Sequence, residues 1–299
     1  MGLFFSSDRF TRPGPGVRPD APRKKGVARL AEIMGRDMWN FFRAGFLAFL
    51  GCLPFIIGMF FAVETHALLF MLLAGIIGGL IAGPELSAMA DTVLRSLRDE
   101  PGYWWETYRR VWKRNARESL VPGMLTGLVL SMQIFTLFHM SVISAGIVTW
   151  VLLILSFVIT LGLESYIWPQ IALLDLPLYG ILKNSLLLFL GYLPRSLGAI
   201  AIKAVYWGAI LLFFPLTTII LPFTNFWLPM LPALLCIYQP LNKCFTIEST
   251  INKMREDELN AALAKDNEPL PEAPTEKAEE STEASSDDSS SDVHVKSIY

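Results

Sequence analysis

Three ionisable side chains stand in or beside long apolar stretches, and they are the strongest candidates for chemistry in this sequence. Glu85 and Glu164 each close an apolar stretch, and Lys203 lies inside another. Charged groups at membrane depth are expensive to bury and often mark a substrate or proton pathway. A structural ion pair, or side chains that extend to the membrane interface, explains the same pattern. We favour this structural interpretation, because no acid stands at the centre of a stretch as a proton-driven pump would need.

Motifs for enzymatic chemistry are missing from the sequence. It contains no GxxxxGK[ST] phosphate-binding loop, no HExxH or GxSxG motif and no His/Cys ligand cluster. The cysteines Cys52, Cys236 and Cys244 form no CxxC pair, which argues against a redox site or a disulfide framework. We therefore expect a protein that is not an enzyme, without catalytic residues, cofactor or metal.

An interfacial helix is predicted between Tyr103 and Leu120, with the sequence YWWETYRRVWKRNARESL. Aromatic residues recur there at helical spacing, and arginines and lysines fill much of the remaining surface. A helix of this kind lies in the membrane interface, although docking to a partner protein would use the same surface. Leu178–Ser196 is a second such segment, too short and too marked by Gly and Pro to span. The residues expected to face lipid headgroups are Trp104, Trp105, Tyr108 and Trp112.

The composition is that of a membrane protein with an acidic tail. The chain has 299 residues, of which 53% are hydrophobic and 17% charged, whereas about a quarter of a soluble domain is charged. Residues 256–299 hold 13 acids and 3 bases, and residues 1–255 hold 14 acids and 22 bases. The small net charge therefore hides a basic body and an acidic tail.

Six stretches are apolar over the roughly 20 residues that a spanning helix needs. We expect a break at Gly83-Pro84 in the second. We also expect the proline-rich sixth to pack against protein, because only neighbouring helices can satisfy the freed backbone groups. The sequence thus predicts an all-α, polytopic membrane protein. The expected spans are Ala44–Val63, Ala67–Ala90, Leu120–Met140, Val142–Leu163, Leu197–Phe214 and Thr217–Tyr238.

The distribution of Lys and Arg predicts the orientation. Bases gather before span one, between spans two and three and after span six, whereas the loops at His66, Ser141 and Pro215 carry none. Cytoplasmic loops carry the excess of Lys and Arg, so both termini are expected in the cytoplasm of a multi-pass cell-membrane protein. More than 35 residues precede the first apolar run, so a cleaved export signal is not expected.

The chain divides into three predicted regions. Residues 1–39 form a basic cytoplasmic leader that ends in an amphipathic helix, and we expect its bases to contact anionic lipid rather than nucleic acid. Residues 40–250 form the six-helix membrane domain. Residues 251–299 form an acidic tail that begins as a helix and then becomes disordered, because it has too few large apolar groups to fold.

The run GPGVRPDAPRKKGVARLAEIMGRDMWNFFRAGFLAFLGCLPF, residues 14–55, resembles the YesL-like family of bacterial integral membrane proteins. The resemblance rests on a G-x-G-V leader, an R-x-x-W helix and a first span that ends in C-L-P. The later stretches GPELSAM and YRRVWKRNARESL also look like the family. The matching residues of the first run are Gly14, Gly16, Val17, Arg36, Trp39, Cys52, Leu53 and Pro54.

The resemblance implies an expected function. The family is a domain of unknown function whose members often sit beside genes for carbohydrate ABC transport. That setting implies an accessory role in carbohydrate uptake or utilisation, with ABC-transporter subunits as partners besides the lipid bilayer, and it supplies no catalytic residues. An independent small-solute permease is the alternative.

Overall fold

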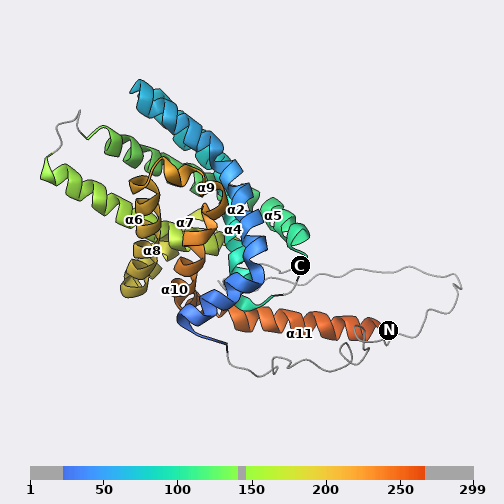
Figure 1. Cartoon of the computed structure of the whole chain (residues 1–299). Coiled ribbons are helices and arrows are strands. Elements are labelled where there is room, and N and C mark those ends of the chain that lie inside the picture. The colour runs from blue at the N-terminus through green and yellow to red at the C-terminus, as the bar shows by residue number, and fades with distance from the viewer. Residues whose placement is uncertain (1–22, 101, 141–145, 267–299) are drawn as a thin grey trace, which may run out of the picture.

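The computed structural model describes residues 23–100, 102–140 and 146–266, and the regular structure within them is helical (Figure 1). The leader upstream of residue 23 and the predicted disorder beyond residue 266 lie outside the described residues. Within the described ranges, six helices are long and apolar enough to cross a membrane, which confirms the all-α, polytopic fold. They are α2 (Gly26–Thr65), the run α3–η1–α4 (Leu68–Arg98), α5 (Trp104–Phe138), α6 (Ile147–Leu173), α8 (Leu193–Leu212) and the run α9–α10 (Leu221–Phe245).

Two helices extend far beyond their predicted spans. α2 has 40 residues and is about 60 Å long, twice the roughly 30 Å of a hydrocarbon core. It joins the predicted amphipathic helix of the leader to span one. α5 has 35 residues and likewise joins Tyr103–Leu120 to span three. The prediction of a separate interfacial helix there was wrong. Residues 104–121 contain no glycine or proline, so nothing in the chain ends the helix before it enters the span.

The second span is irregular at a different place from the one predicted. α3 (Leu68–Leu73) passes into a π-helical turn, η1 (Ala74–Gly78), and α4 (Gly79–Arg98) then continues through Gly83 and Pro84. The predicted Gly-Pro break is therefore absent. A proline removes one helical hydrogen bond but need not end a membrane helix whose neighbours pack closely around it, and Pro84 is buried.

The sixth span packs against protein, as its prolines predicted. It consists of a short helix, α9 (Leu221–Thr224), and α10 (Trp227–Phe245), which buries Pro229 and Pro240. Asn225 separates the two helices. Its Oδ1 accepts hydrogen bonds from the backbone N–H of Phe226 at 2.6 Å and of Trp227 at 3.3 Å, so it satisfies two backbone donors at the beginning of α10.

Small residues bring the second and third spans into direct backbone contact. A Cβ atom added to Gly79 would overlap the backbone of Gly123, and one added to Gly83 would overlap the carbonyl of Ser119. Gly127 in turn lies against the backbone of Gly75 and Gly79. Small residues four apart allow membrane helices to approach this closely. The spacing was visible in the sequence, but the pairing of these two spans was not.

The remaining helices complete the bundle. α7 (Leu178–Gly191) is too short to span and packs between α6 and α8. α11 (Ile247–Asp266) follows α10, buries Ile247 and Ile251 near its start and then projects away from the bundle (Figure 1). The helical start of the predicted tail is thereby confirmed.

Candidate functional site

Glu85 of α4 meets two of the predicted interfacial aromatics of α5. The hydroxyl of Tyr108 donates a hydrogen bond to Oε2 of Glu85, and Nε1 of Trp112 donates one to Oε1 at 3.0 Å. On the other side, the Cγ atom of Glu85 lies against Gly51 of α2. The acid is thus held at the junction of three helices by neutral donors, and not by the lysine that the sequence offered as an ion-pair partner.

The four predicted interfacial aromatics do not share one lipid-facing side. Trp105 is 57% exposed and Trp112 is exposed, but Trp104 is half-buried and Tyr108 is only 4% exposed. The lipid-facing prediction was therefore wrong for Tyr108. The physical reason is the packing of α5 on α4, which buries the face that carries Tyr108 and Val111.

Glu164 of α6 and Lys203 of α8 face the same small cavity. Ser165 and Pro169 of α6 and Met230 of α10 also line it. The cavity measures about 10 Å³, close to the volume that one water molecule requires. Lys203 is only 7% exposed. The structure thus brings together two of the three predicted ionisable residues, as an acid and a base that line the same water-sized space.

The end of α4 carries a cluster of ion pairs that sequence reasoning missed. Asp99 caps α4 in a left-handed conformation, with φ +61°. Its carboxylate accepts a hydrogen bond from Arg29 at 2.6 Å, contacts Nε of Arg23 at 3.2 Å and is bonded by Nη1 of Arg36. Arg23 is the first described residue and the other two arginines belong to α2, so Asp99 connects residues 23–36 to the end of the second span.

The neighbouring Glu100 connects α11 to the same cluster. It forms ion pairs with Arg98 at 2.6 Å, with Arg95 at 3.6 Å and with Arg255 of α11 at 3.4 Å. Its side chain is almost fully buried. A second link runs from Arg23 to Glu248 of α11 at 2.7 Å. We call Asp99, Glu100 and these bonded side chains the ion-pair hub.

Electrostatics hold Asp99 in its charged form. Partial burial raises the pKa of its carboxyl, but the hydrogen bonds and positive charges of Arg36 and Arg29 outweigh this effect and hold the pKa below its usual value. Asp99 therefore keeps its charge to a lower pH than an ordinary aspartate does.

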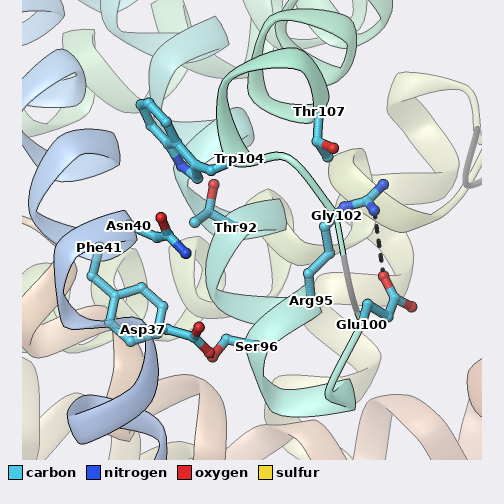
Figure 2. Close-up of a pocket in the computed structure, with 10 residues that line it drawn as sticks. All are labelled: Asp37, Asn40, Phe41, Thr92, Arg95, Ser96, Glu100, Gly102, Trp104 and Thr107. Atoms are coloured by element: carbon cyan, nitrogen blue, oxygen red, sulfur yellow. Dashed lines mark hydrogen bonds and ion pairs between the residues drawn. The ribbon is translucent and has the colours of Figure 1, made fainter. Parts of the chain in front are cut away.

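A polar pocket of about 50 Å³ adjoins the hub (Figure 2). The side chains of Asp37 and Asn40 reach it from α2, those of Thr92 and Arg95 from α4, and Trp104 closes it from α5. Nε1 of Trp104 is buried without a hydrogen-bond partner in the structure. Small-molecule sites usually measure about 300–1,000 Å³, so the pocket has room for a few water molecules or one small polar group.

The deeper polar residues of the spans have structural partners. Nε2 of Gln133 in α5 donates to Thr160 of α6 at 2.8 Å and to Ser156 at 3.1 Å, which joins two helices by polar contacts at membrane depth. Within the described ranges, no three side chains of the His, Cys, Asp and Glu types gather so as to hold a metal ion.

The ion-pair hub could be predicted only in part from the sequence. The bases of the leader were informative about orientation, but their pairing with Asp99 and Glu248 was not predicted. The ion pairs of the hub join residues as far as 225 positions apart, because Arg23 pairs with Glu248 as well as with Asp99.

Comparison of the chain with protein-family models, with curated proteins and with solved structures found no match. The resemblance to the YesL-like family therefore rests on the motif residues of the chain itself.

Proposed function

We propose that this protein is a non-enzymatic, multi-pass protein of the bacterial cell membrane that serves as an accessory component of carbohydrate uptake or utilisation. The YesL-like motif residues between Gly14 and Pro54 support this assignment, because members of that family often sit beside carbohydrate ABC-transport genes. The partner that we propose is an ABC-transporter subunit.

The main support for the proposal comes from helix α11, whose first half is held by ion pairs and whose second half extends away from the bundle. The ion-pair hub fixes its first half through two ion pairs, one from Arg255 to Glu100 beyond the end of α4 and one from Glu248 to Arg23. Its second half leaves the bundle (Figure 1), with Leu259 60% exposed and Leu263 51% exposed. Residues four apart lie on the same side of a helix. A fixed helix with an apolar pair on an acidic background is suited to the groove of a partner protein.

The interior of the bundle favours an accessory role over the alternative of an independent permease. The pocket beside the hub measures about 50 Å³ and the Glu164–Lys203 cavity about 10 Å³, both well below the volume of a typical small-molecule site. The observation in favour of a permease is the Glu164–Lys203 cavity, because ionisable groups inside a membrane mark substrate pathways by default.

The proposed orientation places the hub and both termini in the cytoplasm. The ion pair between Arg23 and Glu248 brings the beginning of the described chain and α11 to the same side, as an even number of spans requires. On that side α5 exposes several bases, each of which contributes about 1 kcal/mol near an anionic membrane surface. Anionic lipid, and not nucleic acid, is the proposed contact for Arg109, Arg110, Lys113 and Arg117.

Copurification from the native membrane in mild detergent tests the accessory role. We expect transporter subunits to accompany the wild type and to be lost from the double variant Leu259→Asp/Leu263→Asp. The matched control, Glu256→Ala/Asp257→Ala, changes two exposed residues of the same helix and should retain them. Deletion of the gene should impair growth on a complex carbohydrate.

A second measurement separates the two functions. The purified protein in liposomes should move no sugar. Sugar uptake by the purified protein that is abolished by Glu164→Gln or Lys203→Met would replace the accessory function with the permease.

A further inference from the structure

At the end of the bundle opposite the hub, two histidines from different helices meet. His66 follows the last residue of α2 and His139 follows the last residue of α5. Nδ1 of His66 lies 2.6 Å from Nε2 of His139, and the two rings are nearly perpendicular, with centroids 4.8 Å apart. They are separated by 73 positions in the sequence, so only the packing of α2 on α5 brings them together.

The hydrogen bonds assign the tautomer of each ring. Nδ1 of His139 lies 2.7 Å from the carbonyl oxygen of Phe135. A carbonyl only accepts, so Nδ1 of His139 carries the proton, and in the neutral ring its Nε2 then presents a lone pair. Nδ1 of His66 therefore donates to that lone pair. The two nitrogens that face each other are the ones that a metal ion would use.

His139 is also held as a metal ligand is usually held. A histidine ligand almost always donates its other ring N–H to a carboxylate, a backbone carbonyl or water, which fixes the ring and raises its basicity. Phe135 supplies that carbonyl, and its ring stacks on His139 with centroids 4.0 Å apart. His139 is buried, whereas His66 is exposed. One ligand is thus fixed in advance and the other is accessible and free to adjust.

We propose that His66 and His139 form a binding site for a borderline divalent transition-metal ion, of which Zn²⁺, Cu²⁺ and Ni²⁺ are the candidates. Imidazole nitrogen suits these ions, whereas Mg²⁺ and Ca²⁺ prefer oxygen. When the metal binds, the proton on Nδ1 of His66 passes through water to Nε2 of the same ring, so both facing nitrogens become lone-pair donors. Water completes the coordination.

The geometry requires only a small adjustment. Two nitrogens at 2.0–2.1 Å from a tetrahedral Zn²⁺ are about 3.3 Å apart, which is wider than the present 2.6 Å separation. Rotation of the exposed His66 side chain provides the difference while His139 keeps its bond to Phe135. The ion then ties the ends of α2 and α5 together, and this role does not depend on the proposed function.

Metal titration of the purified, full-length protein tests the site, with a tag that contains no histidine. Isothermal titration with Zn²⁺ alone should give one ion per chain. His66→Ala and His139→Ala should each lower the affinity at least tenfold. His294→Ala, the matched control at the third histidine of the chain, should leave it unchanged. Zn²⁺ should raise the melting temperature of the wild type but not of the two site variants.

A further variant separates metal binding from the hydrogen bond. His66→Gln retains an N–H donor for Nε2 of His139 but supplies no metal ligand, so it should fold as the wild type and still lose Zn²⁺ binding. Bound Cu²⁺ should show two nitrogen ligands by electron paramagnetic resonance. Absence of a one-to-one Zn²⁺ complex in the wild type, or unchanged affinity in His66→Ala and His139→Ala, would overturn the proposal.

Discussion

The hydroxyl of Tyr108 donates a hydrogen bond to the carboxylate of Glu85, across 23 positions of sequence and between two neighbouring membrane helices. Trp112 donates to the second oxygen of the same carboxylate. The contact joins a candidate ionisable group to two residues expected to face lipid. The helices α4 and α5 are therefore joined by polar hydrogen bonds as well as by the close packing of their glycines.

Tyr108→Phe removes one of these two donors and should destabilise the protein. A typical intramolecular hydrogen bond contributes about 0.5–1.5 kcal/mol to stability, and the side chain of Tyr108 is buried. We expect a lower melting temperature in detergent. Tyr103→Phe is the matched control, because Tyr103 is exposed. Equal melting of Tyr108→Phe and the wild type would show that the hydrogen bond contributes nothing.

Leucine at Gly79 or Gly123 should prevent the close approach of α4 and α5. A side chain at either position meets backbone of the opposite helix, which cannot move aside, and overpacking costs roughly 1–3 kcal/mol or more. Gly208→Leu is the control, since a Cβ there meets nothing within 4 Å. Size-exclusion chromatography should show loss of the monodisperse protein for the first two variants only. A monodisperse Gly79→Leu protein would contradict the packing.

The ion-pair hub should give the protein an acid-sensitive component of stability. The pKa of Asp99 in the folded protein lies below its ordinary value of 3.8. Its contribution is therefore fully present above that value and is lost as the pH falls through the lower, folded pKa. Melting temperatures between pH 6 and pH 2 should decline at the acidic end in the wild type.

Asp99→Asn provides the comparison for this pH dependence. The variant should melt at a lower temperature than the wild type at neutral pH, because Arg29 and Arg36 lose their shared carboxylate. Its melting temperature should then depend less on pH below about 4. Parallel pH profiles for the two proteins would remove Asp99 as the source of the acid sensitivity.

The proposed topology can be measured by labelling single cysteines in a cysteine-free background. Glu64→Cys and Leu216→Cys should react with an impermeant reagent from outside the cell. Tyr103→Cys and Lys253→Cys should react only after the membrane is permeabilised, because both lie at the basic end of the bundle. All four positions are exposed, so accessibility within the protein does not bias the result. External labelling at Tyr103 would reverse the proposed orientation.

The distribution of apolar residues along the sequence was sufficient to predict the number and the approximate positions of the membrane helices. A spanning helix satisfies its own backbone groups and needs only about 20 apolar residues. Hydropathy along the chain is therefore sufficient to find it. The same local reasoning explains why proline in the sixth span predicted contact with protein.

Helix packing decided what the polar residues do. The sequence favoured a structural role for Glu85, as an ion pair or at the interface, over a substrate site, and only the contact of α4 with α5 gave it Tyr108 as a partner. Aromatic and basic residues at helical spacing fit a separate interfacial helix as well as an extension of a span, since both have the same local pattern. Asp99 with Arg29, and His66 with His139, are 70 and 73 positions apart. Such pairs depend on which helices are neighbours, and that choice follows from side-chain fit between spans, which hydropathy along one chain does not encode.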